Sequence, residues 1–499
     1  MQTHQNEGLV SMLLGKLVEK IDIIEISETV KLDEKIGGIC YNSAEVRQGD
    51  VFVAIKGFKT DGHDFMDEAV KKGASCVICE NAPSTDIPHI ITKNSRKTLA
   101  EISAAMFDYP AKKMKLIGVT GTNGKTSTTH ILKFLIEKCS GKKVGLIGTI
   151  ENLIGDDKLE ANLTTPDSYE LQEMLGKMVN AGCQYVVMEV SSHALTLDRV
   201  HGINYDIAVF TNLSPEHLDF HTSINEYANA KSILFTNAKQ SVINIDDDYA
   251  DLMIGRSAGA VTTYAINRDS ADLTGKDIKL YPDKVEYCLV KEGLINRVRF
   301  DVPGMFSVYN SLAATAAAQL LGFSLQDAAA ALSLCPRIKG RAEVLPTDSD
   351  YTIIIDYAHT PDALENIIKA TRANAAKKII TVFGCGGDRD KTKRAQMGKI
   401  AAALSDYVFV TSDNPRTEDP QSIINDILAG MENTGAQGTN YTAIADRKSA
   451  ICKAVDMLNS ADVLIIAGKG HETYQILKDE KIRFDDREVV KNYLSQADK

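Results

Sequence analysis

A glycine-rich loop near residue 120 has the residue types that bind phosphate. It reads GVTGTNGKTS over residues 118–127, directly after an apolar run and directly before a helical pattern. Gly121 and Gly124 allow tight turns and a close approach of the backbone, so that amide N–H groups and the helix dipole can face phosphate oxygens. Lys125 can neutralise terminal phosphates, and the Thr126 hydroxyl is placed to bind Mg²⁺. We therefore predict that this loop binds a nucleotide.

The loop departs by one residue from the general phosphate-loop spacing GxxxxGK[ST]. The residue six before Lys125 is Val119, and the nearest glycine is Gly118. The spacing alone leaves open a glycine-rich strand-to-helix turn that holds no ligand. The adjacent Lys125-Thr126 pair favours a nucleotide.

The tetrapeptide DNPR at 413–416 is a second candidate site. Asn414-Pro415 by itself can be only a turn, although proline also makes a rigid frame for a binding arginine. The planar guanidinium of Arg416 can bind a carboxylate through two parallel hydrogen bonds, whereas it would repel an ammonium group. This pattern favours a ligand with a carboxylate at this end.

Three further residues are ambiguous when each is taken alone. Glu189 ends an apolar strand, where a carboxylate can face a cleft or simply meet solvent. A lone histidine such as His217 is more often a surface or packed residue than a metal ligand. Lys231 lies in a helix-like segment, where an unpaired lysine usually belongs to a solvated face. Spacing alone leaves these alternatives open.

The elements that must position these residues follow a parallel α/β pattern, because apolar runs repeatedly end in polar or Gly-rich loops that lead into helical patterns. Around the glycine loop, a strand at 116–120, a helix at 127–139 and a strand at 143–149 form a βαβ unit. Further buried strands are expected at 185–190, 207–213 and 241–246, and a helix at 311–322. After residue 340 the pattern repeats, and the carboxyl ends of its strands should line one crevice.

Length and two interruptions predict three domains. A chain of 499 residues corresponds to about three domains of roughly 150 residues. Pro110 and a cluster of lysines break both periodicities at 108–115, and a second boundary falls near 336–340. We therefore expect domains at 1–112, 113–337 and 338–499.

Composition excludes several classes of protein. The chain is 44% apolar and 25% charged, which is ordinary for a globular protein and unlike collagen, coiled coils or disordered chains. Its formal net charge of -11 argues against a generally basic nucleic-acid binder. The most apolar segments fall short of the roughly 18 residues that suggest a membrane span, and no export signal is visible.

Nine scattered cysteines, an odd number, are expected to be reduced thiols in a cytoplasmic protein. Cys76 and Cys79 have the CxxC spacing of a metal site, but they lie in a strand-like run and no second pair occurs. We interpret them as residues that pack within a strand.

The loop TGTNGKT (120–126) resembles the nucleotide loop of the Mur ligase family, which comprises ATP-dependent ligases of peptidoglycan precursor synthesis. Other segments resemble family motifs in the family's order along nearly the whole chain. These are NSAEVRQGDVFVAIKGFKTDGHDF (42–65), LTTPDS (163–168), MEVSSHAL (188–195), FTNLSPEHLDFH (210–221), YANAKSILF (227–235), PGMFSVYNSLAA (303–314), DYAHTPDAL (356–364), GDRDKTKR (387–394), DNPR (413–416) and GKGHE (468–472).

This resemblance implies an N-terminal uridine-nucleotide module, a central P-loop-type parallel-sheet ATPase domain and a C-terminal Rossmann-like domain. The motifs are similar to those of members that add the third residue of the stem peptide, and DNPR resembles the form that takes meso-2,6-diaminopimelate. The implied substrates are UDP-N-acetylmuramoyl-L-alanyl-D-glutamate, meso-diaminopimelate and ATP with Mg²⁺, with no nucleic-acid or membrane partner and a monomeric state. The second carboxylate of diaminopimelate would suit Arg416. Two alternatives are the L-lysine-adding form and an ATP-hydrolysing switch or binding protein that joins nothing.

The resemblance also implies four groups of site residues. The catalytic residues are Lys125, Lys231, His217 and Arg341, and the metal ligands are Thr126, Glu189, His217 and Lys231 as a carbamate. The ATP contacts are Gly121, Thr122, Asn123, Gly124, Lys125, Thr126, Ser127, Asn310, Arg341, Asp356 and His359. The uridine-nucleotide substrate is expected at Ser43, Thr164, Thr165, Ser191 and Arg199. Diaminopimelate is expected at Arg389, Asp413, Asn414, Pro415, Arg416, Gly468 and Glu472.

Overall fold

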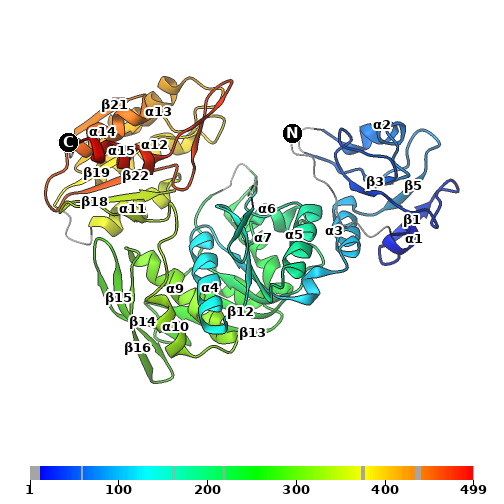
Figure 1. Cartoon of the computed structure of the whole chain (residues 1–499), viewed down its shortest axis with the longest axis horizontal. Helices are drawn as coiled ribbons and strands as arrows, with labels where there is room; N and C mark the ends of the chain where they lie inside the picture. Colours follow the sequence, from blue (N-terminus) through cyan, green and yellow to red (C-terminus); the bar gives the residue numbers. More distant parts are fainter. Residues whose placement is uncertain are drawn as a thin grey trace.

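The chain folds into three lobes, each built on its own main β-sheet (Figure 1). The computed structural model describes residues 12–57, 60–159, 161, 163–216, 220–372, 377–432 and 440–497. The N-terminal lobe and the C-terminal lobe stand on either side of the central one in the view of Figure 1. This arrangement confirms the predicted α/β fold class.

The N-terminal lobe carries a five-stranded sheet in the order β1-β5-β4-β3-β2, in which only β1 runs antiparallel to its neighbour. Cys76 and Cys79 lie in β4 with no exposed surface, which confirms that they are packing residues. The elements of the lobe are α1 (Leu14–Leu17), β1 (Ile23–Ile26), β2 (Gly38–Cys40), β3 (Asp50–Val53), η1 (Gly62–Phe65), α2 (Met66–Lys71), β4 (Cys76–Cys79), β5 (His89–Thr92), α3 (Ser95–Met106) and η2 (Pro110–Lys113).

The central lobe is an eleven-stranded sheet in the order β16-β15-β14-β13-β12-β11-β6-β10-β7-β8-β9. Strands β7, β10, β6 and β11 to β14 run parallel, whereas β8, β9, β15 and β16 add antiparallel pairs at the two edges. The elements are β6 (Lys115–Thr120), α4 (Lys125–Ser140), β7 (Val144–Ile147), β8 (Asn152–Ile154), β9 (Asp157–Leu159), α5 (Ser168–Asn180), β10 (Tyr185–Glu189), α6 (Ser192–Thr196), β11 (Tyr205–Phe210), α7 (Ile224–Thr236), β12 (Ala238–Asn244), α8 (Ala250–Arg256), β13 (Ala260–Ala265), β14 (Leu273–Leu280), β15 (Val285–Lys291), β16 (Leu294–Phe300), α9 (Met305–Leu320) and α10 (Leu325–Leu332).

Alternating side chains of the central strands pack into two separate hydrophobic cores, one on each face of the sheet. Val187 of β10 packs into the core that α4, α9 and α10 cover, whereas its neighbours Val186 and Met188 pack into the core under α5 to α8. Successive side chains of a strand point to opposite faces, so a strand that is buried on both faces reads as a continuous apolar run. This explains why these strands could be predicted from the sequence.

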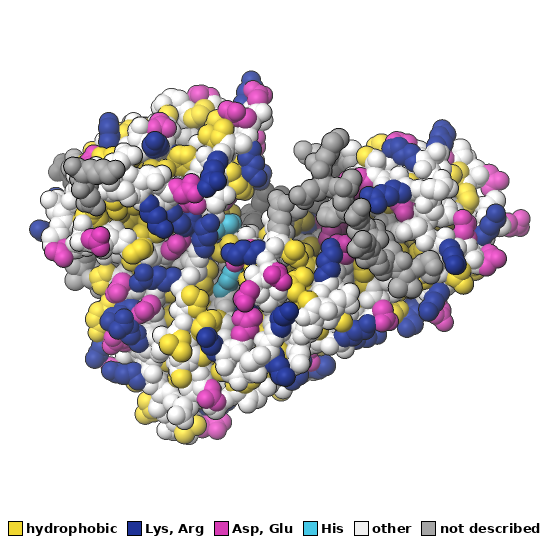
Figure 2. Space-filling model, in the orientation of Figure 1, with side chains coloured by type: hydrophobic (Ala, Val, Ile, Leu, Met, Phe, Trp, Pro, Cys, Tyr) yellow, Lys and Arg dark blue, Asp and Glu magenta, His cyan; other side chains and the backbone are white. Residues whose placement is uncertain are grey.

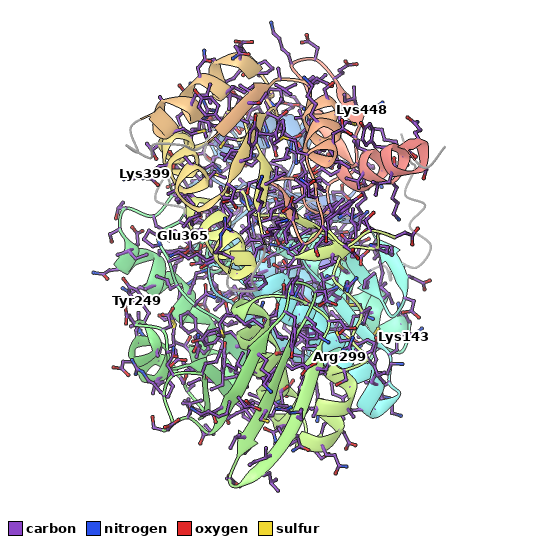
Figure 3. The ribbon with its side chains drawn as sticks, turned by 90° about the vertical axis from the view of Figure 1, so that its left-hand side faces the viewer. Lys143, Tyr249, Arg299, Glu365, Lys399 and Lys448 are labelled. Atoms are coloured by element: carbon purple, nitrogen blue, oxygen red, sulfur yellow. The ribbon has the colours of Figure 1, made fainter. Side chains whose placement is uncertain are left out.

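The C-terminal lobe has a six-stranded sheet in the order β17-β18-β22-β19-β20-β21, in which only β17 runs antiparallel to its neighbour. Its elements are β17 (Glu343–Leu345), β18 (Thr352–Asp356), α11 (Pro361–Arg372), β19 (Ile379–Phe383), α12 (Thr392–Leu404), β20 (Tyr407–Thr411), α13 (Pro420–Glu432), β21 (Asn440–Ile444), α14 (Arg447–Asp456), β22 (Val463–Ala467), β23 (Tyr474–Ile476), β24 (Lys481–Arg483) and α15 (Asp486–Ala497). Figure 3 shows α11, with Glu365 labelled, where this lobe meets the central one.

Other sequence predictions have mixed outcomes. The helix expected at 311–322 begins earlier, at Met305, because Gly304 with a φ of 91° turns the chain into it. All nine cysteines are free thiols, as predicted. None of the helices in the described ranges combines the length and the apolar character that a membrane crossing needs. The domain boundaries at 112/113 and 337/338 stay predictions, close to the starts of β6 and β17.

Candidate active site

The glycine loop joins β6 to α4, and its two glycines sit where a side chain would not fit. Gly124 has a φ of 83°, and a Cβ added there would lie 2.3 Å from Asn310 Oδ1. A Cβ added to Gly121 would lie 1.9 Å from Thr211 Oγ1. The loop is therefore pressed between neighbouring segments, with the amino end of α4 directly behind it, as phosphate binding requires.

Two lysines, the half-buried Lys125 and the fully buried Lys231, converge on one carbonyl of this loop. Lys125 Nζ donates to the oxygens of Gly121 (2.9 Å) and Thr122 (2.8 Å), and Lys231 Nζ from α7 donates to the same Gly121 oxygen at 2.7 Å. Burial lowers the pKa of Lys125. Burial, with the charge of Lys125 beside it, lowers the pKa of Lys231 well below its usual value. Lys231 is 1% exposed, so the solvated helix face considered for it is wrong.

The C-terminal lobe reaches the loop through Arg341, which precedes β17. Arg341 Nη2 donates to Thr126 Oγ1 at 3.0 Å, although the two residues are 215 positions apart. The guanidinium also stacks 4.8 Å from the ring centre of Tyr357. An arginine predicted to bind phosphates thus meets the hydroxyl predicted to bind Mg²⁺.

A cavity of about 590 Å³ lies beside this contact, between the central and C-terminal lobes. Leu280, Phe306 and Tyr309 give part of its wall an apolar character that suits a flat base. The predicted ATP residues that line it are Asn123, Gly124, Ser127, Asn310, Arg341 and Asp356. Figure 2 shows Lys and Arg side chains gathered beside histidines where the C-terminal lobe borders the central one.

The other predicted ATP residues lie in the same loop or just beyond β18, which ends at Asp356. Gly121, Thr122, Lys125 and Thr126 belong to the loop and the first turn of α4. Asp356 ends β18 and accepts hydrogen bonds from the amides of Ala342 and Ala358 (2.7 Å each), while burial raises its pKa. His359 is half-buried, and its desolvation lowers the pKa of its ring, which is therefore neutral at neutral pH.

Glu189 supplies a buried carboxylate at the same edge of the central sheet. It is 0% exposed, and in the register of β10 and β6 it pairs with Val119, just before the loop. Its oxygens accept from the Thr149 amide (2.8 Å) and hydroxyl (3.0 Å). A solvated strand end is therefore excluded. The predicted ligand His217 lies outside the described residues.

The predicted uridine-nucleotide residues form two groups. Ser43 and Arg199 line a cavity of about 400 Å³ between the N-terminal and central lobes. Thr165 Oγ1 accepts from the amide of Ser191, which caps α6, and Arg199 Nη1 donates to the Thr165 carbonyl at 3.0 Å. Thr164 hydrogen-bonds through its hydroxyl to Thr149, which links this group to Glu189. Thr164, Thr165 and Ser191 therefore form the second group, near the central sheet edge, and Arg199 connects it to the cavity.

Most of the residues predicted to bind diaminopimelate meet at the edge of the C-terminal sheet. Asn414 Nδ2 donates to Glu472 Oε2 at 2.8 Å, although the two residues belong to different loops. A Cβ on Gly468 would lie 2.6 Å from Asp413 Oδ2, so the two loops approach closely. Lys469 was not predicted, yet it is 0% exposed and its Nζ donates to Glu472 at 2.9 Å.

Arg416 and Arg389 lie on two loops that are tied together. Arg416 adopts a left-handed φ of 53°, and its Nη1 donates to the Gly387 carbonyl at 2.7 Å. The Thr417 hydroxyl donates to Asp388 at 2.7 Å, and the Pro415 carbonyl leaves no room for a side chain at Gly387. Arg389 Nη1 donates to the Asp388 carbonyl at 3.1 Å. Both predicted arginines therefore sit at one rim, as a carboxylate site needs.

Three family models match this chain in sequence order. Residues 35–108 match the model described as "Mur ligase family, catalytic domain", residues 119–318 the "Mur ligase middle domain" and residues 340–470 the "Mur ligase, glutamate ligase domain". A Clostridium acetobutylicum protein named UDP-N-acetylmuramoyl-L-alanyl-D-glutamate--2,6-diaminopimelate ligase 1 is 44% identical over 93% of this chain and 96% of its own. The chain belongs to the Mur ligase family.

Two further relatives support the assignment of this chain to the Mur ligase family. The UDP-N-acetylmuramoyl-L-alanyl-D-glutamate--2,6-diaminopimelate ligase of Caldanaerobacter subterraneus is 46% identical over 93% of this chain and 96% of its own. A solved structure of an enzyme with that name has a TM-score of 0.71 at 30% identity, and the match covers 98% of this chain and 100% of the solved one. Family membership makes the chain a ligase, and the structural match covers nearly all of it.

Sequence reasoning missed several residues that hold the site of this Mur ligase. Thr211 donates to the Asn123 carbonyl at 2.6 Å, and Asn212 Oδ1 accepts from the Asn123 amide at 2.9 Å. Asp362 on α11 accepts from Asn123 Nδ2 at 2.6 Å. All three lie in motifs quoted for the family, FTNLSPEHLDFH and DYAHTPDAL, as Lys469 lies in GKGHE. Their membership of those motifs was the available signal.

Proposed function

We propose that this chain is an ATP-dependent ligase that joins meso-2,6-diaminopimelate to UDP-N-acetylmuramoyl-L-alanyl-D-glutamate. The observation that carries the proposal is the contact of Arg341 with Thr126, because it sets the amino-acid lobe against the phosphate loop. Relatives whose names state these substrates are 44% and 46% identical over nearly the whole chain. The proposal includes the three domains predicted from the sequence and a monomeric state. It also places the protein in the cytoplasm, because nine unpaired cysteines favour a reducing compartment.

The reaction proceeds in two displacements. An oxygen of the D-glutamyl γ-carboxylate attacks the γ-phosphorus of ATP, ADP leaves, and an acyl phosphate forms. The diaminopimelate amine then attacks the acyl carbon, the bond from carbon to phosphate oxygen breaks, and the amine loses a proton as the amide forms. The first step brings two anions together, and the second expels an anionic phosphate, so both depend on cations and positioning more than on a protein nucleophile. Lys125 and Arg341 supply those cations.

The residues at the sheet edge suit Mg²⁺, which when bound would neutralise phosphate charge. Glu189 is a fully buried carboxylate that accepts hydrogen bonds from the neutral amide and hydroxyl of Thr149. Carboxylate and hydroxyl oxygens are ligands that Mg²⁺ prefers. Glu189 and Thr126 would therefore hold the ion, with His217 as a further predicted ligand.

Lys231 would serve as a carbamate. A lysine amine must be neutral before it can take up CO₂, and burial beside Lys125 lowers the pKa of Lys231 well below its usual value. The carbamate would replace a cation by an anion next to the phosphate loop. There it could hold a metal ion and balance the positive charge of Lys125.

The uridine-nucleotide substrate and diaminopimelate have separate proposed sites. The cavity of about 400 Å³ that Ser43 and Arg199 line has a polar wall that suits the uridine-nucleotide end of that substrate. At the rim of the C-terminal sheet, Arg416 and Arg389 would bind the distal carboxylate of diaminopimelate, and Asp413 and Glu472 its distal ammonium. Lysine lacks that carboxylate, so the arginines favour diaminopimelate.

Amine-dependent phosphate release tests the proposal. With ATP, Mg²⁺ and UDP-N-acetylmuramoyl-L-alanyl-D-glutamate, we expect diaminopimelate to stimulate phosphate release strongly and lysine or glutamate to stimulate it weakly. If lysine were the better amine, the interpretation of Arg416 would be wrong and the lysine-adding form would replace it. Release that no amine changes would instead indicate an ATP-hydrolysing switch.

A further inference from the structure

The segment that carries Arg341 is held by a carboxylate on each side. The Gly340 amide donates to Glu343 Oε2, and the Ala342 amide donates to Asp356 Oδ2, each at 2.7 Å. Gly340 and Ala342 have φ values of 66° and 45°, and the left-handed region is unfavourable for alanine. These two hydrogen bonds therefore hold the two residues that flank Arg341 in left-handed conformations, and so fix the position of Arg341 between them.

Glu343 is in turn held by Arg487 near the start of α15. Arg487 Nε donates at 2.8 Å to the same Oε2 that accepts from Gly340, and Arg487 Nη1 donates to Asp485 Oδ1 at 2.9 Å. The Arg487 side chain is 9% exposed and that of Glu343 is 18% exposed. A planar guanidinium fixes the directions of its N–H groups, so this arginine determines where the Glu343 carboxylate can lie.

The third nitrogen of Arg487 reaches the loop of the amino-acid site. Nη2 donates to the Gly470 carbonyl at 2.7 Å. Gly470 lies two residues before Glu472, which hydrogen-bonds Asn414. The loop also presses on the Arg341 segment, because a Cβ on Gly340 would lie 2.2 Å from the His471 amide nitrogen. One side chain thus links the segment that contacts the phosphate loop with the segment that carries Glu472.

We propose that Arg487 is a positioning residue that couples the placement of Arg341 to that of the Gly468–Glu472 loop. The inference rests on the proposed function, since it assumes that one segment serves ATP phosphates and the other the incoming amino acid. Without the three directed hydrogen bonds, each segment would relax separately. Both the affinity for the amine and the rate of the chemical step would then fall.

Steady-state kinetics of three variants test the coupling. For Arg487→Met we expect the KM for diaminopimelate to rise and kcat to fall, each at least tenfold, because both segments lose their common support. Glu343→Gln should lower kcat with a smaller effect on the KM for diaminopimelate, because it touches only the Arg341 side. The double variant should be no worse than Arg487→Met, since both changes break one link.

The matched control is Arg483→Met, which removes an arginine that is 79% exposed and pairs with Glu488. It should keep wild-type constants. Should Arg487→Met fail to fold, Arg487→Lys, which retains the charge but not the three directed donors, must by itself raise the KM for diaminopimelate. Folded Arg487 variants that melt at lower temperature yet keep wild-type KM and kcat would overturn the inference. If diaminopimelate did not stimulate phosphate release by the wild-type enzyme, the proposed function itself would be overturned.

Discussion

Lys231 shows how burial changes what a residue can do. A lysine on a helix is ordinarily a solvated cation, but this one is 1% exposed and lies 4.4 Å from the ring centre of Tyr227. Its Nζ and that of Lys125 share one carbonyl acceptor. Two ammonium groups so close together repel each other, which favours the neutral amine at Lys231. Chemistry that needs a neutral lysine is therefore available there.

Replacing Lys231 by arginine should lower kcat for phosphate release at least about a hundredfold. A guanidinium stays charged at any working pH and cannot form a carbamate, so a positive charge would remain where an anion is proposed. Lys239→Arg is the matched control, because Lys239 is 71% exposed and pairs with Asp206 at the surface. Equal activity of the Lys231 variant and the control would refute the carbamate.

At the scale of elements, the turn from β6 into α4 decides the position of the phosphate loop. Gly124 precedes the helix in the left-handed region, and Gly141 ends the helix in the same region, where its amide donates to the Glu137 carbonyl. The two glycines have similar conformations but different surroundings. Asn310 presses on Gly124, whereas nothing lies within 4 Å of a Cβ built on Gly141. The same substitution can therefore separate backbone strain from damage to the site.

We expect Gly124→Ala to raise the KM for ATP at least tenfold, because the new methyl group would push Asn310 or the loop out of place. Gly141→Ala should cost about 1 kcal/mol of folding stability through its left-handed φ alone and leave the KM for ATP unchanged. Thermal unfolding and ATP titrations of both variants check this. If the two variants changed the KM for ATP equally, the contact of the new methyl group with Asn310 would not matter for ATP binding.

At the scale of the whole molecule, the C-terminal lobe is fastened to the phosphate loop at two points. Besides the contact of Arg341 with Thr126, Asp362 on α11 accepts from Asn123 Nδ2 (2.6 Å) and from the Ser214 hydroxyl (3.1 Å). These hydrogen bonds span the cavity proposed for ATP. A ligand there would rest on contacts from both lobes, which makes the relative position of the lobes part of catalysis.

Asp362→Ala should loosen this fastening. We expect the radius of gyration in small-angle X-ray scattering to increase without nucleotide and to return toward the wild-type value when an ATP analogue and Mg²⁺ bridge the lobes. Glu365→Ala, on the same helix at the junction seen in Figure 3, is the control and should leave scattering unchanged. An Asp362 variant with the wild-type radius of gyration in both states would show that the relative position of the lobes does not depend on the hydrogen bonds of Asp362.

Local patterns in the sequence determined the parallel strands, the glycine loop and the three-lobed α/β organisation, because buried strands, helix starts and tight turns depend on neighbouring residues. The ordered motifs also predicted a set of site residues, many of which the fold brings together around the two cavities and the C-terminal sheet edge. The pairing of Arg341 with Thr126, the burial of Lys231 and Lys469, and the link through Arg487 were decided only by the tertiary structure. Such contacts join segments far apart in the chain, and whether a charge lies in water or against another charge depends on which segments the fold brings together.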